Sequence, residues 1–258
     1  MSSQIESHNA WVEDTRRFWD TEEDFDARYR RICSDPGIDA CGDEKLLKSM
    51  WAKRTEEELE QLLLDIPIQR DWTCLEIGCG IGRLLKPVAS RCRRAVGIDI
   101  SPKMVAHAER YLCHTPNADV RVNDGCSLPD IEDASIDWVY SHLAFQHITR
   151  RDVVDRYLSE IARVLRRDGY CRIQCWREAT LPWVEKMKNL IRPLLGKPRY
   201  HGPRQWLWGP GREVRFGGVT FHPKQWRSML RDHGLEVTSM QAGLGHDYWM
   251  WTTSRKRR

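Results

Sequence analysis

The sequence has no run of 18 apolar residues, the length that a membrane-spanning helix needs, so we expect no membrane span. Its first residues lack the basic and then apolar order of a signal peptide. No two of its nine cysteines form a C-x-x-C pair, and an odd number fits a pure disulfide framework poorly. We therefore expect a reducing, cytoplasmic compartment and no metal site.

The composition is that of a globular protein. The chain has 258 residues, of which 41% are apolar, enough for one sizeable α/β domain with elaborations. The net charge of +4 says little about partners, but the charge is unevenly spread. Residues 1–70 have a net charge of −7, whereas residues 186–227 hold ten Lys or Arg and one acid.

Strand and helix patterns alternate through the middle of the chain. A helix starting at an N-cap Thr55, with Glu58 completing a capping box, is expected to stop before Pro67. Ser101 and Pro102 supply an N-cap and a first-turn proline for a later helix. The pattern predicts strands at 73–77, 95–99, 119–123, 136–141 and 170–175, with helices over 82–90, 102–112 and 152–166 between them. Such alternation is typical of a parallel sheet with right-handed crossovers.

The alternation of strand and helix patterns stops after the fifth predicted strand. Residues 177–222 are rich in proline, glycine and aromatic residues, and one amphipathic helix, 182–195, fits there. We interpret this segment as an insertion over one edge of the sheet. A helix over 223–233, capped by Gly234, and strands at 235–240 and 246–252 are expected to follow, with residues 254–258 as a solvated basic tail.

The stretch LEIGCGIGR, residues 75–83, joins the first predicted strand to a helix. The dinucleotide pattern G-x-G-x-x-G fails because position 83 is Arg, and no Gly-Lys-Ser/Thr follows as a phosphate-binding loop requires. Asp99 ends the next strand, where an acid can accept from ribose hydroxyls. Glu76 suits a ligand with a cationic group. These residues predict a nucleoside-containing ligand. Which nucleotide or nucleoside a Rossmann-like domain binds here stays open on these residues alone.

At these residues the sequence resembles the class I S-adenosylmethionine-dependent methyltransferases. Their Glu/Asp-x-Gly-x-Gly-x-Gly motif matches residues 76–82, and their acid after the second strand matches Asp99. The acid after their third strand, which contacts the adenine amino group, matches Asp124. The fourth-strand motif matches 136–148, and the turn before the fifth strand matches 165–169, where Asp168 replaces the usual Gly or Pro. The resemblance covers 70–176 strongly and 220–252 weakly.

The resemblance implies a Rossmann-like α/β fold with a seven-stranded, mostly parallel sheet, helices on both faces and one antiparallel strand near the C-terminus. Residues 1–68 would form a helical cap, and 69–258 the cofactor-binding domain with a substrate-lid insertion at about 177–222. S-adenosylmethionine would be the cofactor and S-adenosylhomocysteine the product. The residues then expected to bind the cofactor are Glu76, Gly78, Cys79, Gly80, Gly82, Arg83, Asp99, Ile100, Met104, Asp124, Gly125, Cys126, Ser141 and Leu143.

The catalytic candidates follow the fourth predicted strand. Either His142 or His147 can act as a general base near neutral pH; the alternative is that both only position the loop by hydrogen bonding. For Phe145 the alternatives are a ligand contact or a place in the core. The residues proposed to contact substrate are Phe145, Gln146, Tyr29, Trp206 and Trp208.

The predicted function is methyl transfer to an O or N atom of a small polar or anionic metabolite. In that interpretation the basic insertion is a lid over an anionic substrate. The alternative is a solvated basic surface. A methyltransferase acting on RNA or protein is the second hypothesis, and a non-catalytic cofactor-binding protein the third. No base-methylation signature follows the fourth strand, which favours a small molecule over nucleic acid. The oligomeric state is not predicted.

Overall fold

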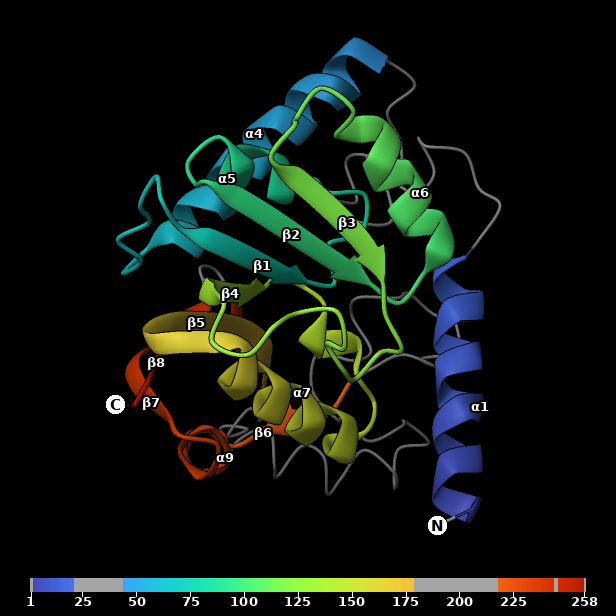
Figure 1. The fold of residues 1–258 in the computed structure, drawn as a ribbon, viewed down its shortest axis with the longest axis vertical. Helices are drawn as coiled ribbons and strands as arrows, with labels where there is room; N and C mark the ends of the chain where they lie inside the picture. Colours follow the sequence, from blue (N-terminus) through green and yellow to red (C-terminus); the bar gives the residue numbers. More distant parts are fainter. Residues whose placement is uncertain (1, 21–43, 179–217, 244–245, 258) are drawn as a thin grey trace, which may run out of the picture.

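The structure, a computed structural model, describes residues 2–20, 44–178, 218–243 and 246–257. Within these ranges eight strands form one sheet (Figure 1). They are β1 (Thr73–Ile77), β2 (Arg94–Asp99), β3 (Ala118–Val122), β4 (Ile136–Ser141), β5 (Leu165–Arg177), β6 (Thr220–Phe221), β7 (Leu235–Gly243) and β8 (His246–Lys256).

The strand order is β3-β2-β1-β4-β5-β8-β7, with the short β6 pairing in parallel with the end of β5. β8 runs antiparallel to both β5 and β7, and the other pairings are parallel. This confirms the predicted Rossmann-like architecture with one reversed strand; β6 is an addition that the sequence did not signal. The chain crosses from the β1–β2–β3 half to the β4–β5 half beside β1, and ligands of such sheets bind at that switch point.

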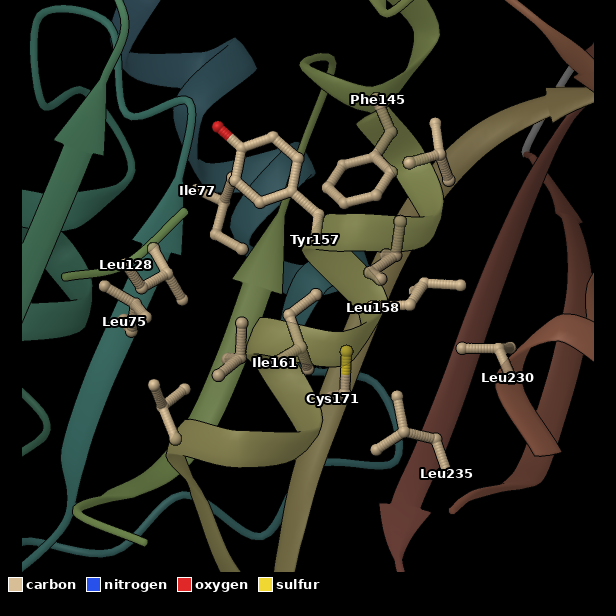
Figure 2. Packing of buried hydrophobic residues seen from close by; sticks show 14 of the residues in the cluster. Leu75, Ile77, Leu128, Phe145, Tyr157, Leu158, Ile161, Cys171, Leu230 and Leu235 are labelled. Carbon is tan, nitrogen blue, oxygen red and sulfur yellow. The ribbon is translucent and has the colours of Figure 1, made fainter. Parts of the chain in front are cut away.

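Helices cover both faces of the sheet. α4 (Glu44–Leu63), α5 (Leu85–Ala89) and α6 (Pro102–Tyr111) pack on one face, together with Cys74, Ala95 and Trp138 of the strands. α7 (Arg151–Val164) and α9 (Pro223–Asp232) pack on the other, on Leu75 and Val139. Figure 2 shows Leu158 and Ile161 of α7 directed at Cys171 of β5, and Leu230 of α9 near Leu235. Adjacent strand residues therefore serve opposite cores, which explains the fully buried pattern of β1.

The helix α7 forms because its apolar residues recur on one stripe. Its buried residues are Val153, Val154, Tyr157, Leu158, Ile161 and Val164, and each such side chain stabilises the fold by roughly 1.5–3 kcal/mol when fully buried. The predicted helix over 152–166 is confirmed to within two residues at each end. Likewise, Ser101 accepts a hydrogen bond from the Met104 N–H and caps α6, as predicted.

The expected start of the helix before β1 was wrong. α4 begins at Glu44, so Thr55 and Glu58 lie inside the helix and form no capping box. Residues 44–54 hold three Lys and two Leu together with Glu, Met, Ala and Arg, residues that favour helix and extend it past the local Thr signal. Glu58 instead faces the protein interior.

The basic tail is also not a free end. β8 continues to Lys256, and Ser254 is completely buried. The Lys256 ammonium donates to the Leu165 carbonyl at 2.7 Å, and the Arg257 N–H donates to the Gly234 carbonyl at 2.9 Å. The expectation of a free tail was therefore wrong for the backbone of Ser254–Lys256, which pairs with β7, whereas the side chains of Arg255 and Arg257 are exposed as expected.

The first helix, α1 (Ser2–Trp19), stands at the carboxyl-end side of β2 and β3, next to the start of α6 (Figure 1). The predicted insertion of 177–222 begins and ends on the sheet, because Trp176 and Arg177 of β5 pair with Thr220 and Phe221 of β6. Its expected helix, 182–195, lies outside the described residues.

Candidate functional site

The glycine-rich loop is held tightly by backbone hydrogen bonds. The N–H groups of Gly78 and Cys79 both donate to the Ile98 carbonyl, at 2.8 and 3.0 Å. Gly78 has a φ of +75°, and a Cβ there would lie 2.2 Å from the Cβ of Ala144. Gly82, with a φ of +79°, likewise packs against Leu112. Glycine is therefore required at both positions by backbone conformation and by close packing.

Gly80 differs from the other two glycines of the motif. It also has a positive φ, +52°, but no described atom lies within 4 Å of the position that a Cβ would take. Its N–H donates to Oδ2 of Asp99 at 2.8 Å. The loop therefore leaves open space over Gly80, where backbone and ligand can approach closely.

Asp99, at the end of β2, organises this turn. Its Oδ1 accepts from the Ser101 N–H at 2.9 Å, so one carboxylate links the glycine loop to the start of α6. Burial raises the pKa of Asp99, although the bonds from Ser101 and Gly80 oppose the shift. Each oxygen keeps a further lone pair that can accept from a ligand hydroxyl.

Glu76 is the second buried acid of the site. Its Oε2 accepts from the Tyr140 hydroxyl at 3.1 Å. Burial raises the pKa of Glu76 to about 8, while Tyr140 and Arg83 act in the opposite direction. A buried carboxylate with so high a proton affinity would be stabilised in its charged form by a ligand cation.

The loop after β3 forms a tight turn around Asp124. Oδ1 of Asp124 accepts from the Cys126 and Ser127 N–H groups at 3.0 and 2.7 Å, and Oδ2 accepts from the Ser127 hydroxyl. Partial burial raises the pKa of Asp124, but these hydrogen bonds outweigh it and hold the pKa below its usual value. Asp124 itself is exposed. Gly125 packs against Ile100, which a Cβ at Gly125 would approach within 2.6 Å.

α1 covers this part of the site through specific contacts. Arg16 donates to the carbonyls of Ile100 and Asn123 at 3.1 and 3.2 Å. The indole N–H of Trp11 donates to the Thr149 hydroxyl at 3.0 Å. Asp20, just after α1, accepts from the Ser101 hydroxyl. The N-terminal helix thus contacts the loops after β2, β3 and β4.

The loop after β4 is bent back onto the sheet. The Ser141 hydroxyl donates to the Ile77 carbonyl at 2.8 Å. Leu143 has a φ of +60°, and its N–H donates to Oε1 of Gln174 at 2.9 Å. A non-glycine residue in this region stores strain, a feature that is common at functional sites. Phe145 of η1 (Phe145–His147) is fully buried against Tyr157 (Figure 2), so the structure places it in the core.

The two candidate histidines lie in different surroundings. Nε2 of His142 is 2.9 Å from Oε2 of Glu58, and its ring stacks on Trp251 at 5.2 Å and 6°. Burial lowers the pKa of His142, and Glu58 opposes that shift. His147 is half-buried and meets Trp19 of α1 edge to face at 5.2 Å. Gln146 lies beside it, with its Nε2 3.2 Å from Nε2 of His147.

The methyltransferase domain family matches residues 75–173, the segment that contains the glycine loop, Asp99, Asp124 and the loop after β4. Residues 75–173 form a methyltransferase domain.

Curated relatives agree with this assignment. An uncharacterised methyltransferase of Schizosaccharomyces pombe is 31% identical over 129 residues, 49% of this chain and 48% of its own length. Malonyl-[acyl-carrier protein] O-methyltransferase of Methylococcus capsulatus is 35% identical over 42% of this chain and 38% of its length. Phosphoethanolamine N-methyltransferase of Triticum aestivum is 25% identical over 70% of this chain and 35% of its length. The chain thus spans less than half the length of each of these relatives.

The fold of the methyltransferase domain also recurs among solved structures. The complex of the Haloferax volcanii Trm112 methyltransferase activator with a candidate methyltransferase matches with a TM-score of 0.62 at 20% identity. The match covers 92% of this chain and all of that chain. At this identity the similarity supports the fold alone.

The remaining predicted residues of the methyltransferase domain are placed as follows. Cys79 is buried against Gly97, and Met104 is buried in the first turn of α6. The Cys126 thiol is buried and its pKa is raised by that burial. Tyr29, Trp206 and Trp208 lie outside the described residues. No group of three or more metal-ligating side chains occurs within the described ranges, and no helix in them is long and apolar enough to cross a membrane.

Glu58 was not among the residues that the sequence predicted for the site. Glu58 of α4 contacts Arg83 of the glycine loop as well as His142. It was assigned to a capping box because Thr55 precedes it by three residues. The signal that could have corrected this was the strong helix-forming sequence before Thr55, which makes an interior helical position more favourable.

Proposed function

We propose that this chain is an S-adenosylmethionine-dependent methyltransferase that acts on an O or N atom of a small polar or anionic metabolite. The observation that supports it best is the open space over Gly80, whose N–H donates to the buried Asp99, with a second buried acid, Glu76, just before the same loop. Glu76 is unhelpful to a phosphate-binding loop, because its ionised form would repel an anion, whereas it suits a ligand with a cationic group.

The residues fit this cofactor. Glu76 can pair with the ammonium of its amino-acid part, and Asp99 can accept from the two ribose hydroxyls. The turn of Asp124 and the side chain of Ile100 border the region assigned to adenine. When bound, the cofactor supplies an electrophilic methyl carbon whose bond to sulfur breaks with the electron pair staying on sulfur. The protein has to align the acceptor and remove its proton.

His142 is the better candidate for the general base. Its ring is fixed by Trp251, and Glu58 stabilises its charged form. His147 lies between Gln146 and Trp19, a setting that suits packing of α1 on the site. We assign proton removal to His142 and a positioning role to His147.

The choice of an anionic acceptor is supported by two relatives. One acts, by its name, on malonyl-[acyl-carrier protein] and the other on phosphoethanolamine, and both groups are anionic. The basic segment 186–227 would suit such a substrate, with Trp206, Trp208 and Tyr29 as further contacts. A methyltransferase acting on RNA or protein is the second candidate, in which the basic segment 186–227 would bind a phosphate backbone.

Residues 1–68 would act as a cap on the cofactor site and 177–222 as a lid on the substrate site. For the cap, the supporting contacts are those of Arg16, Trp11 and Asp20 with the loops after β2, β3 and β4. For the lid, both ends of the segment lie beside the carboxyl end of β5. A cytoplasmic location stays a prediction.

Calorimetry with S-adenosylmethionine and with NAD tests the cofactor. We expect binding of S-adenosylmethionine and no comparable binding of NAD. Preferential binding of NAD, or of neither, would contradict the proposal.

A methyl-transfer screen tests the acceptor. Labelled S-adenosylmethionine is incubated with pools of phosphorylated and carboxylated metabolites and, separately, with total RNA and with protein. Label in a metabolite pool is expected. Label in RNA or protein alone would overturn the small-molecule assignment and leave the cofactor assignment intact.

A further inference from the structure

A buried ionic cluster joins α4 to the glycine loop and to the loop after β4. Glu58, Arg83 and His142 are 7%, 6% and 8% exposed. Arg54, one turn before Glu58, donates to its Oε1 at 2.7 Å, and Arg83 donates to its Oε2. Arg83 also donates to the Thr55 hydroxyl at 3.3 Å.

The ion pair between α4 and the glycine loop does not need the histidine, which adds the contact with the loop after β4. Glu58 already pairs with the guanidinium groups of Arg54 and Arg83. Burial raises the pKa of Glu58, but His142 and then Arg83 outweigh it and hold that pKa well below the usual range. His142 adds a buried imidazole to this set, and burying a polar nitrogen without a partner costs roughly 1–3 kcal/mol. The buried Nδ1, for which the described residues supply no partner, is the part of this imidazole that a purely structural role leaves unexplained.

The two ring nitrogens of His142 have different surroundings. Nε2 faces Oε2 of Glu58 at 2.9 Å, an ion-pair distance without the straight geometry of a hydrogen bond. Nδ1 is buried and has no hydrogen-bond partner among the described residues. The charged groups around the ring are Glu58 and Arg54 of α4 and Arg83 of the glycine loop. The carboxylate is the one group among them that attracts a proton to Nε2.

We infer that Glu58 is a positioning residue that holds the proton of His142 on Nε2 and so leaves the lone pair of Nδ1 to receive the acceptor's proton. The inference rests on the proposed function. In the transfer, the acceptor's lone pair bonds to the methyl carbon, its O–H or N–H proton moves to Nδ1, and the former carbon–sulfur pair remains on sulfur. The N-terminal segment would then complete the catalytic site as well as cover it.

The test uses NMR of the full chain labelled with ¹⁵N in histidine, with His142→Gln to assign the signals. The wild type is expected to show Nε2 protonated and Nδ1 unprotonated, and Glu58→Gln a mixture of tautomers with a lower imidazole pKa. Glu57→Gln, at an exposed neighbouring position, is the matched control and should match the wild type. Identical His142 signals in wild type and Glu58→Gln, or a wild type protonated on Nδ1, would overturn the inference.

Two further measurements keep the result unambiguous. Glu58→Asp retains the charge, so it is expected to keep the wild-type tautomer even if Glu58→Gln does not fold; a tautomer mixture in a folded Glu58→Asp protein would count against the inference. Calorimetry of the wild type with S-adenosylmethionine is run in parallel. Absence of binding would contradict the proposed function. The tautomer measurement tests only the role of Glu58, so the two failures can be told apart.

Discussion

Tyr140 and Glu76 face each other on neighbouring strands, and the Tyr140 hydroxyl donates to the Glu76 carboxyl at 3.1 Å. Burial raises the pKa of Glu76 from 4.5 to about 8, so the folded protein keeps this proton in a pH range where the unfolded chain has lost it. The folded state therefore binds more protons between about pH 4.5 and 8, and its stability must fall as the pH rises through that window.

Glu76→Gln removes this titration and keeps an oxygen for Tyr140. Between pH 5 and 8 the free energy of unfolding of the variant should improve relative to the wild type by roughly 1.4 kcal/mol per pH unit. Urea unfolding at four pH values measures the difference. A difference that does not change with pH would show that Glu76 is ionised in the folded protein.

Alanine at Gly78 should mainly reduce stability, whereas alanine at Gly80 should mainly reduce ligand binding. Gly78→Ala brings its Cβ to 2.2 Å from that of Ala144 and should destabilise the fold by roughly 3 kcal/mol or more. Gly80→Ala meets no described atom and should cost only about 1–2 kcal/mol for its left-handed backbone. Because it fills the space over the loop, it should weaken S-adenosylmethionine binding at least tenfold. Thermal unfolding and calorimetry on both variants check this; wild-type affinity in Gly80→Ala would refute the assignment of that space.

Asp99→Asn keeps the shape of the side chain but loses its charge and one of its two accepting oxygens. The loop then loses a bond from Gly80 or Ser101, and ribose loses an acceptor. Since bonds to charged groups contribute about 1.5–3 kcal/mol, affinity for S-adenosylmethionine should fall by about 10- to 100-fold. Asp119→Asn, at a partly exposed position on the edge strand β3, is the control. Equal losses in the two variants would argue against a ribose contact.

Arg16→Gln should release α1 from the sheet, because the guanidinium donates to two backbone carbonyls, those of Ile100 and Asn123. Amide hydrogen exchange within residues 2–19 should become faster, while exchange in β1 and β4 stays unchanged. Arg17→Gln, at an exposed position of the same helix, should leave exchange as in the wild type. Unaltered protection of α1 in Arg16→Gln would mean that Trp11 and Asp20 hold the helix without it.

Local sequence predicted the elements whose signals are local. The bounds of β1 and β4 match the prediction because each is a short apolar run ended by turn residues, and the Ser101 cap needs only its own neighbours. The start of α4 was missed because helix propensity over residues 44–54 outweighs the Thr55 signal. The last strand was predicted too short. Its basic side chains, Arg255 and Lys256, donate to the carbonyls of Asp168 and Leu165, which only the folded sheet brings near them.

The site divides in the same way. The sequence by itself predicted the resemblance to methyltransferases, the glycine loop and the acids Glu76, Asp99 and Asp124, since each lies in or next to a short strand whose pattern is local. The tertiary structure alone decided that Glu58 meets His142 and Arg83, that α1 contacts the loops after β2, β3 and β4, and that Phe145 belongs to the core. These contacts join residues far apart in the chain, and their energies depend on burial and on partners that no local pattern specifies.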